Sequence, residues 1–195
     1  YLLIKDSTYE KLYGSYDFLE TKRKHLSFER YFHFTNDHDF TIYLDNDIFV
    51  YPDSQELPKV SGLMNVREPE GNSSKIFREV NNLDQNVGYF NSGVTMCDKR
   101  TAKILSNYMI NRLDNRNKAK GKNSDNMLLN EFIIENRNIF TELGNEWNYM
   151  PFLTNSQKIK NPNFFHFVGI HGKNLINELQ KNRISILDFL KELKK

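Results

Sequence analysis

Residues 41–50 read TIYLDNDIFV, an apolar run interrupted by the carboxylates of Asp45 and Asp47. The β-branched and aromatic residues of such a run are typical of a buried strand. Charged side chains at the end of a buried strand are unfavourable unless a partner compensates them, and a cation is the simplest partner for two acids. Ligands of open α/β sheets bind at the carboxyl ends of strands, where this pair would lie. We therefore expect Asp45 and Asp47 to hold a divalent ion, and the ion to hold a diphosphate.

Asp and Asn also favour turns, so the two acids have a simpler interpretation as residues that cap a strand-to-turn junction. A second acid-x-acid triplet, Asp37-His38-Asp39, has the same form but follows a polar loop. Because no strand leads into this second triplet, we do not expect it to bind a metal.

The chain has 195 residues, enough for a substantial core, and we expect a single domain over residues 1–195 that belongs to a longer protein. Aromatic residues reach 13%, so Phe and Tyr are expected to build much of the core. A net charge of +2 is too small to indicate nucleic-acid binding, and no apolar run is long enough to span a membrane. Cys97 is the only cysteine, which excludes an intramolecular disulfide and favours a reducing, cytoplasmic location.

Hydrophobic periodicity predicts helices and strands that alternate along the chain. The predicted helices cover residues 16–34, 99–113, 124–134 and 176–193, and the predicted strands cover residues 61–66, 87–98, 139–143 and 163–168. Residues 67–74 contain Pro69 and Gly71 and are expected to form a surface loop. Residues 169–173 are expected to form a Gly-rich, basic turn.

Four features have both a functional and a structural interpretation. Asn91-Ser92-Gly93 interrupts an apolar strand, as a bulge or a close ligand approach would, although an ordinary turn has the same composition. His166 lies in an apolar strand and is either a core residue or a ligand. Arg23 lies in a basic helix, either on a solvated face or within reach of the diphosphate. Asp125 either caps a helix or contributes to the site.

Five motifs in the chain follow one another in the order found in glycosyltransferase family eight. They are Tyr43-Leu44-Asp45-Asn46-Asp47, Tyr89-Phe90-Asn91-Ser92-Gly93-Val94, Ser124-Asp125-Asn126-Met127-Leu128-Leu129-Asn130, Trp147-Asn148 and His166-Phe167-x-Gly169. From Thr41 to about Lys173 the chain resembles this family, which includes glycogenin and bacterial lipopolysaccharide glucosyl- and galactosyltransferases. The resemblance implies a GT-A fold, which is a Rossmann-like α/β architecture with a mixed, mostly parallel central sheet flanked by helices.

The resemblance also implies roles for individual residues. In the family the two acids and the late histidine bind Mn²⁺, so Asp45, Asp47 and His166 are expected to hold Mn²⁺, with Mg²⁺ as the alternative ion, against the phosphates of a nucleotide sugar. Asp125 and Asn126 take the positions of catalytic residues, and Asn126 stands where the family usually has Gln. The expected donor-binding residues are Asp45, Asn46, Asn91, Ser92, Gly93, Gly169, Lys173 and Arg23.

The chain departs from the family pattern at three places. The late motif of the family usually ends in Lys-Pro-Trp, whereas here Lys173 comes one position late and Pro-Trp is absent. Asn126 is one methylene shorter than Gln. The family's base-binding strand and helix lie well upstream of the acid triplet, and too little chain precedes Asp45 to hold them, so we expect that strand to lie outside this sequence.

These observations predict a metal-dependent glycosyltransferase that moves a hexose from a nucleotide sugar, UDP-glucose or UDP-galactose, to a hydroxyl group of a glycan or protein. The resemblance implies retention of the anomeric configuration. Two alternatives stay open. One is a non-catalytic module that binds nucleotide sugars, favoured by the missing Pro-Trp and the short Asn126. The other is a haloacid-dehalogenase-like phosphatase with Asp45 as its nucleophile, although Ile48-Phe49 and the lack of a later acidic pair fit that class poorly.

Overall fold

The computed structural model describes residues 38–116, 125–153 and 156–193. The described strands are β1 (Phe40–Leu44), β2 (Ile48–Val50), β3 (Leu63–Arg67), β4 (Phe90–Asp98), β5 (Phe140–Leu143) and β6 (Phe164–His166). The described α-helices are α3 (Asn72–Val80), α4 (Lys99–Arg116), α5 (Asp125–Glu135), α6 (Gly169–Lys181) and α7 (Ile186–Leu193), with short 3-10 helices η1 (Arg137–Ile139) and η2 (Asn145–Trp147). The helix predicted at 16–34 lies outside the described residues.

The central sheet has four described strands in the order β1-β4-β3-β5. The long strand β4 runs antiparallel to both β1 and β3, and β3 runs parallel to β5. The expected mixed sheet flanked by helices is therefore confirmed. The expectation that the sheet is mostly parallel is wrong for the described strands, because β4 lies between two neighbours and runs against each of them.

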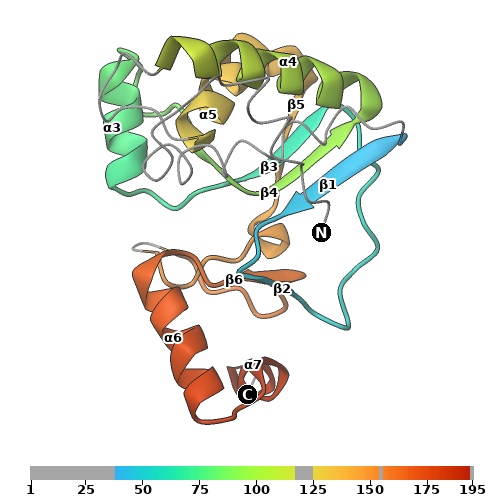
Figure 1. Cartoon of the computed structure of the whole chain (residues 1–195), viewed down its shortest axis with the longest axis vertical. Helices are drawn as coiled ribbons and strands as arrows, with labels where there is room; N and C mark the ends of the chain where they lie inside the picture. The colour runs from blue at the N-terminus through green and yellow to red at the C-terminus, as the bar shows by residue number, and fades with distance from the viewer. Residues whose placement is uncertain (1–37, 117–124, 154–155, 194–195) are drawn as a thin grey trace, which may run out of the picture.

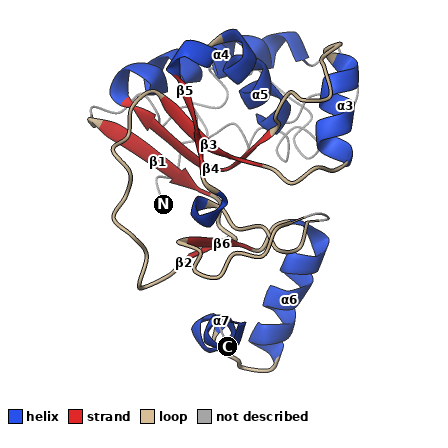
Figure 2. Ribbon diagram, turned by 180° about the vertical axis from the view of Figure 1, so that it is seen from behind, coloured by secondary structure: helices blue, strands red, loops and turns tan. Residues whose placement is uncertain are grey.

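Both faces of the sheet are buried. Figures 1 and 2 show α3, α4 and α5 on one side of the sheet, with β2, β6, α6 and α7 beyond the end of β1. One set of strand residues packs with α4 and α5: the cluster contains Leu63, Phe90, Cys97, Leu105, Leu128 and Phe132. The alternating set packs with η2 and β6: this cluster contains Met64, Val66, Val94, Met96, Trp147, Met150 and Phe164. A strand covered on both faces is apolar or small along its whole length, and β4 is buried up to its last residue for this reason.

Two segments that were expected to be loops are helical. The predicted loop at 67–74 is shorter in the structure and ends at Gly71. The Gly71 N–H donates to the Ser74 hydroxyl (3.1 Å), and α3 begins at the next residue. The apolar residue of α3 that faces the core, Phe77, is fully buried. The predicted turn at 169–173 is the first turn of α6, which Gly169 enters with φ +78°.

The single helix predicted at 176–193 is two helices, α6 and α7. The break is at Arg183, which has φ +56° and donates its N–H to the Gln180 carbonyl (3.1 Å). The next residue, Ile184, donates to the Leu179 carbonyl (2.9 Å), and this pair of bonds closes a Schellman motif. None of the helices in the described part of the chain has the length and hydrophobicity needed to cross a lipid bilayer.

Candidate metal centre and donor site

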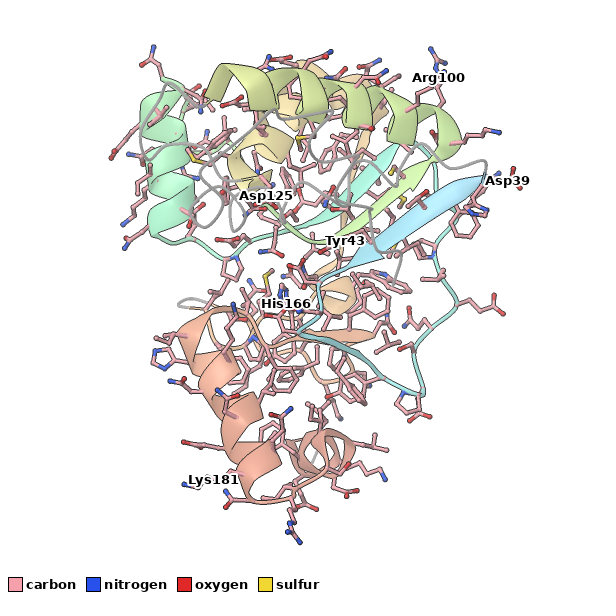
Figure 3. All side chains as sticks on the ribbon, viewed as in Figure 1. Asp39, Tyr43, Arg100, Asp125, His166 and Lys181 are labelled. Atoms are coloured by element: carbon pink, nitrogen blue, oxygen red, sulfur yellow. The ribbon has the colours of Figure 1, made fainter. Side chains whose placement is uncertain are left out.

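Asp45, Asp47 and His166 lie together beyond the end of β1. One ligand atom from each of the three side chains lies within 4.8 Å of the other two. The Nε2 atom of His166 is 3.1 Å from Asp47 Oδ1 and 3.9 Å from Asp45 Oδ2. Figure 3 labels His166 near the end of β1, whereas Asp39 of the second acidic triplet lies at the start of that strand. Among the described residues, this is the one group of three or more side chains able to hold a metal ion.

Backbone hydrogen bonds bring these three side chains together. The Asp45 N–H donates to the Gly93 carbonyl (2.8 Å), which ties the end of β1 to β4. In the small sheet Ile48 pairs with His166, and the Phe167 N–H donates to the Asp47 carbonyl (2.9 Å). His166 therefore lies beside Asp47 because β2 and β6 pair, although the two residues are far apart in the sequence.

The donor atoms and the space around them fit a divalent cation. The Tyr43 hydroxyl donates to Asp45 Oδ1 (2.7 Å), and the other oxygen of Asp45 faces His166. A Cβ atom on Gly93 would contact the His166 ring and would lie 2.9 Å from Asp45 Oδ2, so His166 and Asp45 can lie this close to β4 only because residue 93 has no side chain. Two carboxylates and an imidazole are a ligand set that suits Mn²⁺ better than Mg²⁺.

A bulge in β4 brings Gly93 to this point. The pairing of β3 with β4 jumps from Asn65–Thr95 to Val66–Asn91, so the residues between are out of register with β3. The Asn65 side chain fills the bulge, with Nδ2 at 2.8 Å from the Val94 carbonyl and 3.3 Å from the Asn91 carbonyl. Asn91-Ser92-Gly93 is therefore a bulge within a strand and not a turn between two strands.

Ser92, Asp125 and Asn126 lie next to one another beside this bulge. The Ser92 N–H donates to Asn126 Oδ1 (2.6 Å), and the Ser92 hydroxyl lies 3.2 Å from Asp125 Oδ2. Asp125 is the first residue of α5, where the helix dipole favours a negative charge, so both of its interpretations are compatible with the structure. The structure thus places the expected catalytic pair against the expected sugar-binding strand, and contact with a donor stays a prediction.

A continuous path of hydrogen bonds joins the three metal-site residues to the Ser92 group. His166 Nδ1 lies 2.9 Å from Asn148 Oδ1, and Asn148 Nδ2 donates to Asn91 Oδ1 (3.0 Å). Asn91 Nδ2 then donates to Glu68 Oε2 (3.0 Å), which also accepts a longer bond from Asn126 Nδ2 (3.3 Å). Asn91, Asn148 and His166 are buried, Asn148 with only 1% of its surface exposed, whereas Glu68 and Asn126 are half-buried.

The local environment changes the acidity of two carboxyl groups in the site. Burial alone would raise the pKa of Asp47, but the neighbouring His166 and, less strongly, the charge of Lys173 outweigh burial and lower that pKa. The pKa of Glu68 is raised, because burial outweighs the hydrogen bonds that it accepts from Asn91 and Asn126. An ionised Asp47 is ready to bind a cation at neutral pH, whereas Glu68 is the weaker acid of the two.

The remaining predicted donor residues lie at the edge of the site or outside the described residues. Asn46 is exposed in the turn between β1 and β2. Gly169 and Lys173 are exposed in the first turn of α6, and the Lys173 charge acts on Asp47. Arg23 lies outside the described residues. Donor binding by these four residues stays a prediction.

Sequence reasoning missed the roles of Glu68 and Asn148. Glu68 falls in the segment predicted as a surface loop, and no local pattern marks it. Asn148 follows Trp147, which is buried with 6% of its surface exposed. Asn148 was noted only as part of the motif Trp147-Asn148, and the further signal for its role is that a buried amide beside a core Trp needs hydrogen-bond partners.

Comparisons with known proteins identify a family and similar folds. A family model described as "Glycosyl transferase family 8" matches residues 15–173. An active-site mutant of LgtC is similar at TM-score 0.52 and 16% identity, over 80% of this chain and 66% of that chain. The galactosyltransferase LgtC in complex with donor and acceptor sugar analogues gives TM-score 0.49 and 14% identity, over 73% of this chain and 58% of that one. Mouse xyloside xylosyltransferase 1 in its apo form gives TM-score 0.49 and 16% identity, over 82% and 68%.

The likeness at TM-score 0.52 shows a shared fold, and the expected GT-A fold is confirmed. No curated protein sequence matches the chain. The chain spans 58–68% of the length of the three solved structures.

Proposed function

This chain belongs to glycosyl transferase family 8, and we propose that it moves a hexose from a nucleotide sugar, UDP-glucose or UDP-galactose, to a hydroxyl group of a glycan or protein, with retention of the anomeric configuration. The observation that carries this proposal is the convergence of Asp45, Asp47 and His166 from two different sheets. Such a ligand set is suited to an ion that faces the diphosphate of a donor.

Asp45, Asp47 and His166 would hold Mn²⁺, or Mg²⁺ in its place. The bound ion would supply positive charge next to the diphosphate, where negative charge develops as the sugar leaves. Lys173 is exposed at the start of α6, and its charge acts on Asp47, which supports a role for Lys173 in binding the same diphosphate. We assign Arg23 a similar role on the basis of the family resemblance.

The sugar itself would lie against the bulge in β4. The side chains of Asn91, Ser92 and Asp125 are polar groups at the bulge, and they would bind its hydroxyl groups. Asn126 is held by the Ser92 N–H and by Glu68, and it would position the reacting face of the sugar. Positioning and electrostatic stabilisation of the leaving diphosphate account for most of the rate in such a reaction, because little covalent chemistry is required of the protein.

A non-catalytic binding module is the alternative that one observation favours. Asn126 stands where the family usually has Gln, and both of its polar atoms already have partners within the protein. The phosphatase alternative is less well supported, because it needs a later acidic pair. Among the described residues, the group that contains Asp45 has a histidine, His166, as its third member.

Titration with Mn²⁺ and donor hydrolysis test the proposal. We expect the parent to be stabilised against thermal unfolding by UDP-hexose only when Mn²⁺ is present, and to hydrolyse the donor slowly without an acceptor. Asp45→Asn, Asp47→Asn and His166→Gln should abolish both effects. Asp39→Asn is the matched control, because Asp39 is exposed and belongs to the acidic triplet at the start of β1. GDP- and ADP-hexoses test the choice of base.

Three outcomes would separate the alternatives. Donor hydrolysis by Asp45→Asn and Asp47→Asn at the parental rate would overturn the proposal. Mn²⁺-dependent binding of UDP-hexose with no hydrolysis and no transfer would support the binding module. A beryllofluoride adduct trapped on Asp45 would support the phosphatase.

A further inference from the structure

We propose that Asn148 is a positioning residue that holds neutral His166 in the tautomer with its proton on Nδ1, which leaves the Nε2 lone pair available to a cation. The proposal rests on the proposed function for the cation, but the tautomer is a property of the protein alone. The tautomer follows from which atom donates in each of four linked hydrogen bonds, the first of which is donated by the Gly93 N–H.

The first bond sets the orientation of Asn91. The Gly93 N–H can only donate, so the Asn91 side-chain atom at 2.9 Å from it must be the carbonyl oxygen Oδ1. The amide nitrogen of Asn91 then faces the Glu68 carboxylate at 3.0 Å, which accepts its hydrogen bond. The reverse orientation of the Asn91 amide would place two donors against each other at Gly93 and two acceptors at Glu68.

The orientation of Asn91 sets that of Asn148, and Asn148 sets the tautomer of His166. Because Asn91 Oδ1 only accepts, the Asn148 atom at 3.0 Å from it must be the donor Nδ2. The other end of the amide, Asn148 Oδ1, therefore faces His166 Nδ1 at 2.9 Å. An amide oxygen cannot donate, so the proton of this bond belongs to His166 Nδ1.

Asp47 favours the opposite tautomer. Its Oδ1 atom lies 3.1 Å from His166 Nε2, and a carboxylate at that distance would accept a proton carried on Nε2. In that tautomer the Nδ1 lone pair would face Asn148 Oδ1, an acceptor against an acceptor in a buried site. Asn148 thus disfavours a proton on His166 Nε2, the atom that would bind the cation. The outer-sphere partners of metal-binding histidines act in the same way in other sites.

The same path also reaches the Ser92 group. Glu68 accepts from Asn91 and from Asn126, and Asn126 in turn accepts from the Ser92 N–H. The residues that orient His166 and the residues expected to bind the donor sugar are therefore held by a common carboxylate.

Nitrogen-15 spectra of the histidine rings test the tautomer directly. They are recorded with chelator at a pH where the imidazole is neutral, and the His166 signals are assigned by their absence in His166→Gln. We expect the proton on Nδ1 in the parent. In Asn148→Leu, which removes both polar atoms at similar volume, we expect the proton to move to Nε2 and the Mn²⁺ affinity to fall by roughly 10- to 100-fold. Asn148→Asp keeps an acceptor opposite Nδ1 and should retain the tautomer, but its second carboxylate oxygen replaces the donor that faces Asn91 Oδ1, so this variant should be less stable than the parent.

Asn145→Leu is the control, because Asn145 is exposed at the start of the short helix η2, which ends next to Asn148, and the same substitution there should change neither the tautomer nor the Mn²⁺ affinity. A proton on Nε2 in the parent would overturn the proposal, even if no Asn148 variant folds. An unchanged tautomer and Mn²⁺ affinity in Asn148→Leu would also overturn it. A parent with the proton on Nδ1 that binds no Mn²⁺ would contradict the proposed function and leave the tautomer assignment standing.

Discussion

Gly93 faces the imidazole ring of His166 so closely that no side chain fits between them. A Cβ atom on Gly93 would contact His166 Cε1, and it would also lie 2.8 Å from Asn91 Oδ1 and 2.9 Å from Asp45 Oδ2. Carbon atoms do not approach neighbours at such distances without displacing them. The glycine of the bulge in β4 is therefore required by space, because it borders the metal-site residues on the side opposite β6.

Gly93→Ala should weaken cation binding and leave the chain folded. The added methyl group would push His166 and Asp45 apart, so we expect the Mn²⁺ affinity to fall at least about 10-fold and the stability to fall by about 1–3 kcal/mol. Isothermal titration with Mn²⁺ and urea unfolding measure the two effects. Gly71→Ala is the control, since a Cβ atom there meets only the Pro69 carbonyl, at 3.8 Å. Parental Mn²⁺ affinity in Gly93→Ala would contradict the assigned geometry.

Asn65→Leu should destabilise the bulge itself. The Asn65 side chain is fully buried and donates to the Val94 carbonyl and to the Thr95 hydroxyl (2.9 Å). A leucine would leave these buried acceptors without their donor, and we expect a loss of about 2–4 kcal/mol in the free energy of unfolding. Urea unfolding checks this value. The control is Asn136→Leu, because half-buried Asn136 makes only a local bond to the Phe132 carbonyl, and a comparable loss there would contradict the interpretation.

The sequence predicts those parts of the fold that depend on local patterns. The strand that ends at Asp45 and the helix after Asp98 follow from apolar periodicity, whereas the glycine within a buried strand left a bulge and an ordinary turn as alternatives. α3 was not predicted, because the contact between side chains that holds this helix leaves no periodic pattern in the sequence. Its buried Arg78 is held by two hydrogen bonds to Glu70 (2.9 and 2.6 Å), and only the folded chain shows that pair.

Strand direction and the roles of Asn148 and Glu68 could not be predicted, because they too depend on contacts between distant parts of the chain. β4 runs antiparallel to both neighbours, and its direction relative to them depends on which strands lie beside it in the sheet. The sequence of a single strand does not encode that arrangement. Asn148 acquires its role only when β2 pairs with β6 and brings His166 beside it. Contacts of this kind depend on residues far apart in the chain.

Asp98→Ala should lower the stability by about 1–2 kcal/mol at pH 7, because Asp98 caps the first turn of α4. Its oxygens accept from the Thr101 N–H (2.8 Å) and from the Gly62 N–H (2.6 Å). Burial alone would raise the pKa of Asp98, but these bonds lower it below its ordinary value of 3.8. The stabilisation is therefore complete above that value and is lost as the pH falls through the lower, folded-state pKa. Urea unfolding from pH 3 to pH 7 measures it, with exposed Asp53→Ala as control. A difference that does not shrink in acid would contradict this account.

Glu68→Gln should raise the stability of the metal-free protein above neutral pH. The pKa of Glu68 is raised by burial, so the ionised carboxylate is destabilising, and this effect is absent below the ordinary pKa of 4.5 and complete above the folded-state pKa. The oxygen of a glutamine can still accept from Asn91 and Asn126, so the hydrogen bonds need not be lost. We expect the variant and the parent to unfold alike at pH 4, and the variant to become the more stable of the two as the pH rises to 8. Urea unfolding with chelator measures this. Lower stability of the variant at pH 8 would show that the negative charge of Glu68 stabilises the site.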